Sequence, residues 1–190
     1  MTYQNFLAGR WVDGDAVLPV EDPATGEVFE EAPLAGETTM AQALDAARAS
    51  ADRGDMARMT PQARADLMRA VAREIRALAD EGAPILTRES GKRLSDAQDE
   101  FAEAAAYFDY YGGLADKIEG KHIPLGPDYV DYTVLEPMGV SAQVVPWNFP
   151  VSLAARSLAP ALAAGNAVIV KSPELDPLGM TMLARALERA

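Results

Sequence analysis

The sequence of 190 residues contains no cysteine. This absence excludes disulfide bonds and thiolate metal sites within the chain. Histidine is almost absent too, since His122 is its one representative. His122 falls in an expected loop between Gly120 and Pro124, with no nucleophile beside it, and we expect no catalytic role for it.

Long hydrophobic runs and clusters of basic residues are also missing. No apolar run approaches the roughly 20 residues of a membrane-spanning helix, and the polar start at residues 1–5 lacks the regions of a secretory signal. We therefore expect no membrane contact and a cytoplasmic location. The 17 Lys and Arg residues against 29 Asp and Glu residues give a net charge of -12. Nucleic acid is not an expected partner, because no basic stripe is present to bind phosphates.

Carboxylates gather near the middle of the chain, at Asp96, Asp99, Glu100 and Glu103. Such a cluster suggests a metal site, but this spacing spreads the groups around the surface of a helix. Neither a histidine nor a second acidic cluster accompanies them. We therefore expect no metal, and we assign these groups to the acidic first turns of a helix, where they suit its dipole.

The amino-terminal part predicts a few strands followed by a helical body. Residues 5–12 have the pattern of a hairpin, and the turn at 23–26 leads into a strand at 27–32. Helical spacing then covers residues 38–52, 60–82, 85–89 and 95–111. Thr38 and Thr60 are the expected N-caps, Pro61 suits the first position of the second helix, and Gly91 ends the third.

Side chains of the helical body are assigned by their position on the predicted helices. The arginines of the second helix should form a solvated face paired with nearby acids: Arg64, Arg69, Arg73 and Arg76. The aromatic residues of the fourth helix are expected in the core: Phe101, Tyr107, Phe108, Tyr110 and Tyr111.

The most informative stretch lies between residues 142 and 174. Residues 142–145 and 167–170 are short apolar runs, each closed by a proline or a lysine, as completely buried parallel strands would be. Between them, residues 151–164 are rich in Ala and Leu, and Gly165 with Asn166 supplies a helix stop. The pattern predicts a βαβ unit.

Polar side chains follow both strands of this unit. Ligands bind beyond the carboxyl ends of parallel strands, where Trp147, Asn148, Lys171 and Glu174 fall. The Lys and Glu are spaced to reach ribose hydroxyls or an adenine edge, and the Asn amide is suited to donate to a developing oxyanion. The alternative is structural, with Trp147 and Phe149 in the core and Asn148 as a helix cap. The residues alone leave both interpretations open.

These motifs resemble the aldehyde dehydrogenase superfamily, the NAD(P)-dependent oxidisers of aldehydes. The resemblance is carried by Pro-Trp-Asn-Phe-Pro at 146–150, Leu-Ala-Pro-Ala-Leu-Ala-Ala-Gly-Asn at 158–166 and residues 168–174. Further matches follow the family's order at residues 11–12, 22–27, 89–92, 110–111 and 115–121. A single motif of this kind is weak evidence for the family, whereas several matches in the same order over nearly the whole chain are strong evidence.

The resemblance implies an α/β fold for residues 1–190. We expect an incomplete Rossmann-like parallel sheet of a cofactor-binding domain, with an amino-terminal helical region and a protruding β-hairpin arm at 121–137. In the family this arm pairs with another subunit, which implies a homodimer or homotetramer. We expect the catalytic domain to be absent from this chain.

The resemblance also assigns site residues. Asn148 matches the oxyanion-stabilising amide and is the one catalytic residue expected. The expected cofactor-binding residues are Val145, Pro146, Trp147, Asn148, Lys171, Ser172 and Glu174. An ionised Glu174 would accept from ribose hydroxyls and repel a 2′-phosphate, so NAD is expected in preference to NADP. The chain departs from the family's frequent Lys-Pro-Ser-Glu, because Pro173 stands one position later.

Family members use a cysteine thiolate to form a thiohemiacetal that passes hydride to NAD, and a glutamate to activate water. They are also more than twice as long as this chain. We therefore expect an amino-terminal fragment of an NAD-dependent aldehyde dehydrogenase that acts on an aldehyde substrate when complete and is inactive alone. The alternative is a non-catalytic nucleotide-binding or oligomerisation module.

Overall fold

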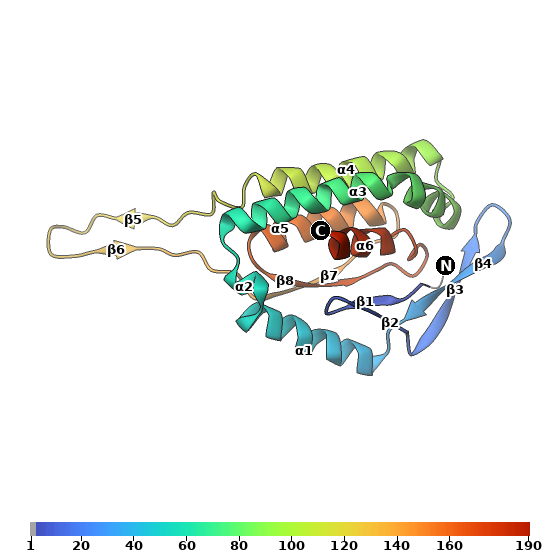
Figure 1. Cartoon of the computed structure of the whole chain (residues 1–190), viewed down its shortest axis with the longest axis horizontal. Coiled ribbons are helices and arrows are strands. Elements are labelled where there is room, and N and C mark those ends of the chain that lie inside the picture. Colours follow the sequence, from blue (N-terminus) through green and yellow to red (C-terminus); the bar gives the residue numbers. More distant parts are fainter. Residues whose placement is uncertain (1–2) are drawn as a thin grey trace.

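The computed structural model describes residues 3–190 (Figure 1). Its elements, in chain order, are β1 (Asn5–Leu7), β2 (Arg10–Val12), β3 (Ala16–Asp22), β4 (Glu27–Leu34), α1 (Glu37–Arg53), α2 (Asp55–Arg58), α3 (Pro61–Ser90), α4 (Leu94–Gly112), β5 (His122–Ile123), β6 (Asp131–Tyr132), β7 (Val140–Val144), α5 (Pro150–Ala163), β8 (Ala167–Lys171) and α6 (Thr181–Arg189). The strands described pair two by two, β1 with β2, β3 with β4, β5 with β6 and β7 with β8. None of the helices within residues 3–190 is long and apolar enough to cross a membrane.

Two antiparallel hairpins open the chain. β1 and β2 are joined by Ala8 and Gly9, whose φ angles of 50° and 78° are both positive, as a tight two-residue turn requires. The predicted hairpin at 5–12 is therefore confirmed. β4 confirms the strand expected at 27–32 and extends it to Leu34. Its partner β3 was not predicted, because Pro19 breaks the usual pattern of a strand.

The first helix begins differently from the prediction. Its N-cap is Gly36, and Thr38 lies inside the first turn, so the assignment of Thr38 as the cap is wrong. A carboxylate oxygen of Asp15 accepts hydrogen bonds from the Gly36 N–H at 2.5 Å and the Thr39 hydroxyl at 2.9 Å. Both bonds lower the pKa of Asp15, and the bond from Gly36 has the larger effect. A distant residue thus supplies the cap, which local sequence does not reveal.

α3 is one continuous helix, although two were predicted. Its start is confirmed, since the Thr60 hydroxyl accepts from the Ala63 N–H at 3.1 Å, and so is its end at Gly91, where φ is 73°. Gly82 and Pro84 lie inside the helix instead of breaking it. Gly82 allows α4 to approach, because a Cβ atom there would lie 2.3 Å from Cζ of Phe101. Tertiary packing overrides the local helix-breaking signal.

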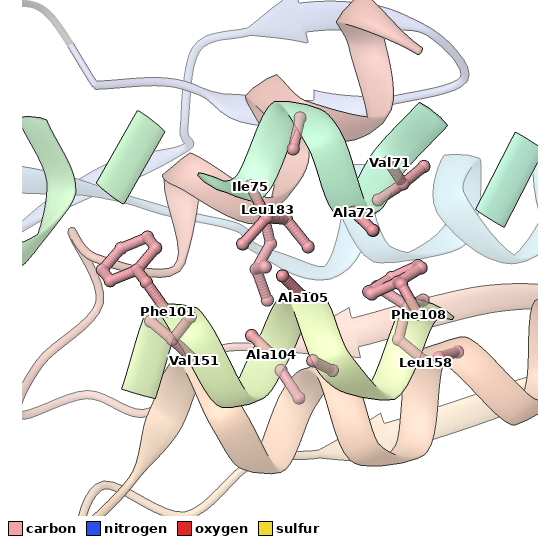
Figure 2. Packing of buried hydrophobic residues seen from close by; sticks show 14 of the residues in the cluster. Val71, Ala72, Ile75, Phe101, Ala104, Ala105, Phe108, Val151, Leu158 and Leu183 are labelled. Atoms are coloured by element: carbon pink, nitrogen blue, oxygen red, sulfur yellow. The ribbon is translucent and has the colours of Figure 1, made fainter. Parts of the chain in front are cut away.

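The main core lies where α3, α4, α5 and α6 meet (Figure 2). Its side chains include Val71, Ile75, Phe101, Phe108, Val151, Leu158 and Leu183. The prediction of core aromatics is confirmed for Phe101 and Phe108, which are fully buried. It is wrong for Tyr110, which is 63% exposed and makes an edge-on contact with Tyr111.

The arginines of α3 form only part of the solvated face that was predicted. Arg69 does pair with Asp66 on the surface, at 2.8 Å. Arg64 does not belong to that face, because it donates to the backbone oxygens of Ala163 at 2.9 Å and Met59 at 2.7 Å. Arg64 therefore caps the carboxyl end of α5 by a hydrogen bond to the Ala163 carbonyl, since the last carbonyls of a helix lack partners within it.

β7 and β8 run parallel, with α5 as the crossover between them. The predicted βαβ unit is confirmed, and the stop at Gly165 is present with φ of 90°. The prediction that both strands are completely buried is wrong. In β7 only Gln143 is buried, and Val144 is mostly exposed. Each strand has one neighbour in the described chain, so the outer edges lie open.

Residues 121–137 extend away from the body as a thin hairpin (Figure 1). Pairing is limited to two residues on each side, with His122 opposite Tyr132 and Ile123 opposite Asp131. His122 therefore lies in a strand and not in the expected loop. The chain on both sides of β5 and β6 is exposed, including the apolar side chains of Leu125, Val130 and Val134.

Candidate functional site

The turn at residues 146–149 links β7 to α5 and carries three of the predicted site residues. Val145, just after β7, is buried, and its N–H donates to the backbone oxygen of Lys171 at 3.1 Å. Val144 is the register partner of Lys171. The two strands therefore end at the same edge, and the side chains that follow them start from neighbouring backbone positions.

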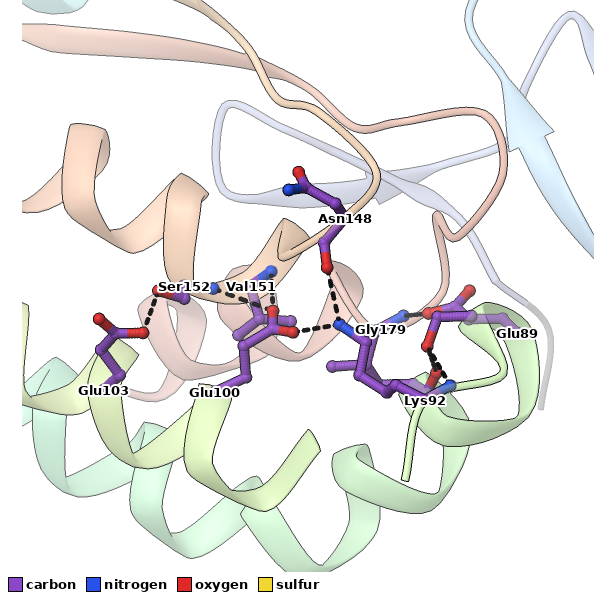
Figure 3. A network of polar contacts seen from close by, with 10 residues as sticks. Glu89, Lys92, Glu100, Glu103, Asn148, Val151, Ser152 and Gly179 are labelled. Atoms are coloured by element: carbon purple, nitrogen blue, oxygen red, sulfur yellow. Dashed lines mark hydrogen bonds and ion pairs between the residues drawn. The ribbon is translucent and has the colours of Figure 1, made fainter. Parts of the chain in front are cut away.

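The Asn148 side chain lies exposed on this turn. Figure 3 shows its amide directed away from α4, while its backbone oxygen accepts from Nζ of Lys92 at 3.2 Å. Asn148 is not a helix cap, because Phe149 holds that position and no side-chain cap bond is formed. Trp147 and Phe149 are 60% and 49% exposed, so they are not core aromatics either. The structural alternative is therefore wrong for this turn.

Lys171 and Glu174 follow β8 and pair with each other. Nζ of Lys171 lies 2.5 Å from Oε2 of Glu174, and both side chains are exposed. The hydrogen bond from Lys171 lowers the pKa of Glu174, so the carboxylate is ionised at neutral pH. Ser172 between them is half-buried, and Pro173 is buried. An exposed, ionised carboxylate with a cation beside it is suited to accept hydrogen bonds from vicinal hydroxyls.

A buried ion pair beneath the turn was missed by the sequence analysis. Lys92, between α3 and α4, contacts Glu100 of α4, and the two side chains are 13% and 1% exposed. The prediction that the acidic group is spread over the surface is therefore wrong for Glu100. A signal was present, because Ala97, Glu100, Phe101 and Ala104 all fall on the buried stripe of one helix.

Two further carboxyls are buried near this pair. Glu89 accepts from the backbone N–H groups of Leu178 at 2.7 Å and Gly179 at 2.6 Å, yet burial raises its pKa to about 8. Burial also raises the pKa of Asp176 to about 7, against the attraction of Lys92. Oδ1 of Asp176 has no hydrogen-bond partner. Within the described residues, no three acidic or histidine side chains are placed to hold a metal ion.

A cavity of ≈ 840 Å³ lies along β8 and reaches Ser172 at the end of that strand. It is lined mainly by apolar residues of the β1–β2 hairpin, α1, α5, β8 and α6. Ser172 is the predicted site residue that borders it, whereas Asn148, Lys171 and Glu174 are outside its lining. The polar groups that predict ligand chemistry therefore lie at the open edge of the strands and not in this cavity.

Comparison with known proteins gives a consistent result. The sequence profile described as "Aldehyde dehydrogenase family" matches residues 11–190. The chain is 35% identical over 189 residues to a (Z)-2-((N-methylformamido)methylene)-5-hydroxybutyrolactone dehydrogenase of Acinetobacter baylyi, covering 99% of this chain and 39% of that protein. It is 40% identical over 182 residues to a 3,6-anhydro-alpha-L-galactose dehydrogenase of Streptomyces coelicolor, covering 95% and 37%.

Solved structures agree with these sequence matches. The NAD+ complex of an aldehyde dehydrogenase from Bacillus cereus superposes with a TM-score of 0.95 at 31% identity, covering 99% of this chain and 39% of that one. A succinate-semialdehyde dehydrogenase from Burkholderia pseudomallei gives 0.93 at 34% identity, covering 100% and 39%. The chain thus spans about 39% of the length of these relatives.

Proposed function

Because the chain belongs to the aldehyde dehydrogenase family, we propose that it is the amino-terminal portion of an NAD-dependent enzyme that oxidises an aldehyde to a carboxylic acid. The observation that carries this proposal is that the exposed Asn148 follows β7 and the exposed Lys171–Glu174 pair follows β8, at the ends of two strands that pair in parallel. The cavity does not carry it, because few polar groups converge there.

Asn148 is the residue proposed to act on the reacting centre. Its side-chain amide is exposed and points away from α4, so it is available to donate a hydrogen bond to the oxygen of an aldehyde under attack. A donor fixed before the reaction stabilises charge as it develops, and removal of one such donor costs about a hundredfold or more in rate. The chain has no cysteine, so it does not itself contain the thiolate that the proposed reaction requires.

The Lys171–Glu174 pair is proposed to hold the adenosine ribose of NAD, with Val145, Pro146, Trp147 and Ser172 along the same edge. When bound, NAD supplies the acceptor for the hydride of the aldehyde. The lowered pKa of Glu174 keeps its carboxylate ionised, which suits two ribose hydroxyls and opposes a 2′-phosphate. This charge favours NAD over NADP.

The chain alone is expected to produce no NADH from NAD and an aldehyde, because no thiol is available for the attack. It should still bind NAD weakly, with a Kd on the order of 1 mM, a binding free energy of roughly -4 kcal/mol. Absorbance at 340 nm and titration calorimetry measure the two quantities. NADH formation by the pure chain, or tight NAD binding, would refute the partial-site proposal.

A charge-neutral variant tests the cofactor preference. Glu174→Gln removes the carboxylate that opposes a 2′-phosphate, so NADP affinity should rise towards that of NAD. Glu119→Gln makes the same change at an exposed position outside the strand ends and serves as the control. An equal response of both variants would show a general effect of net charge.

The arm at 121–137 is proposed to join subunits into a homodimer or homotetramer. Support comes from its short backbone pairing and its exposed apolar side chains: Ile123, Leu125, Tyr129, Val130, Tyr132 and Val134. Such a ribbon has open edges on both sides, which favours the addition of a strand from another chain.

The same arm gives a test of oligomerisation. Val130→Lys and Val134→Lys together should shift the chain towards monomer in sedimentation-velocity measurements, because the charges oppose an apolar contact. Arg93→Lys on the helical body, which preserves charge, is the control. A monomeric parent chain at high concentration, or an assembly that survives the double variant, contradicts the arm as the interface.

The second candidate is a nucleotide-binding or oligomerisation module without chemistry, and the absence of any cysteine favours it. The two candidates differ in the reading frame downstream of the Ala190 codon. An in-frame segment with a Cys and a Glu supports the enzyme, whereas a stop codon there supports the module.

A further inference from the structure

The buried ion pair of Lys92 and Glu100 lies directly against the turn that carries Asn148 (Figure 3). Removal of two charges from water is costly, and the attraction between them offsets this only if their remaining hydrogen-bond groups are also satisfied. The partners that satisfy them therefore show which part of the chain the pair organises.

Glu100 binds the start of α5. Its Oε1 contacts Lys92, and its Oε2 accepts from the N–H groups of Val151 at 2.8 Å and Ser152 at 3.2 Å. The first N–H groups of any helix lack partners within it. Phe149 at the N-cap has no oxygen in its side chain, so a carboxylate from α4 caps α5 instead, at the end where the helix dipole favours negative charge.

Lys92 binds the turn just before α5. Its Nζ donates to the backbone oxygen of Asn148 at 3.2 Å and lies 4.9 Å from the centre of the Phe149 ring, within the range of a cation–π contact. Lys92 follows Gly91, whose left-handed conformation ends α3. The ammonium group is therefore held from one side by the end of α3 and from the other by Glu100.

We propose that Lys92 and Glu100 are positioning residues for Asn148. They hold the backbone on both sides of Phe149, which leaves the Asn148 amide directed away from α4. The inference rests on the proposed role of Asn148 in the reaction, and neither residue touches the substrate. Loss of Lys92 frees the Asn148 carbonyl and leaves a buried carboxylate unpaired.

The experiment measures the order of the turn in the chain as it exists, without cofactor or aldehyde. Backbone ¹⁵N relaxation gives the order parameters of Trp147 and Asn148, and those of α4 provide an internal reference. In the parent chain they should be near 0.85, and in Lys92→Met they should fall below about 0.6 while those of α4 stay high. Lys92→Arg keeps the charge and the donors and should restore much of the order.

Matched variants separate this role from general destabilisation. Arg93→Met truncates the next residue, whose ion pair with Asp96 lies on the surface, and should leave the turn unchanged. Glu100→Gln keeps one acceptor oxygen but removes the charge, and it is the second variant to measure if Lys92→Met does not fold. It too should disorder residues 147–148.

Two outcomes overturn the inference. One is unchanged order of the turn in folded Lys92→Met and Glu100→Gln, and the other is an equal loss of order in Arg93→Met. The failure of the proposed function would appear separately, as absent NAD binding by the parent chain, because the relaxation measurement requires no ligand.

Discussion

Replacement of Phe101 by alanine is expected to lower the free energy of unfolding by about 3–5 kcal/mol. The Phe101 ring is fully buried between helices and lies so close to Gly82 of α3 that a Cβ atom there would overlap it. The backbone of α3 is held by its own hydrogen bonds and cannot fold inward to fill the space. A cavity therefore remains, and its cost adds to that of the lost apolar burial.

Urea denaturation followed by circular dichroism at 222 nm measures this loss. Tyr110→Ala is the matched control, because it truncates an aromatic side chain of the same helix that is 63% exposed. Its effect should stay within about 1 kcal/mol, as at most surface positions. Equal losses for the two variants would place the core elsewhere than at the contact of α3 with α4.

Asp176→Asn is expected to stabilise the chain at neutral pH and to have little effect in acid. Burial raises the pKa of Asp176 to about 7, whereas an unfolded aspartate ionises near 3.9. Between these values the folded chain holds a proton that the unfolded chain has released. The contribution of this proton to stability is complete below the unfolded pKa and is lost as pH rises towards 7.

Asparagine has no proton to release, so it avoids this loss. At pH 7.5 the variant should exceed the parent by on the order of 2 kcal/mol, a difference that shrinks towards pH 4.5. Unfolding free energies from urea titrations at several pH values give the comparison. Glu89, whose pKa is raised to about 8 by burial, contributes a slope of the same sign that both chains retain.

Asp45→Asn on the exposed surface of α1 is the control for this pH dependence. Its stability profile should follow that of the parent chain across the whole range. A profile of Asp176→Asn that also runs parallel to the parent would show that the pKa of Asp176 is the same in the folded and unfolded chains, and would contradict the prediction.

Local signals in the sequence predicted the elements whose causes are local. Thr60 caps α3, Gly91 ends it in the left-handed region, and Gly165 stops α5, each through its own backbone or side chain. The errors lie where a distant residue decides. Gly82 remains helical because Phe101 needs the space, and α1 is capped by Asp15 from before β3.

In the candidate site too, features with local causes were predicted and features that depend on distant residues were missed. Asn148, Lys171 and Glu174 were predicted because each follows an apolar run, and the parallel register of β7 with β8 brings the strand ends together. The contacts of Lys92 and Glu100 with the turn before α5 were missed, because their partners lie about 50 positions further along the chain. The position of Glu100 on the buried stripe of α4 was the one feature of the sequence that indicated a buried contact.

The Lys92 contact spans 56 positions of the chain. Since loop closure over such a distance must be offset by contacts already formed, we expect the turn to acquire its geometry after α3 and α4 have docked. The polar edge is then expected to form late in folding. A substitution in α3 or α4 that slows their docking would therefore delay formation of the polar edge in newly synthesised chains, even if Asn148, Lys171 and Glu174 were all unchanged.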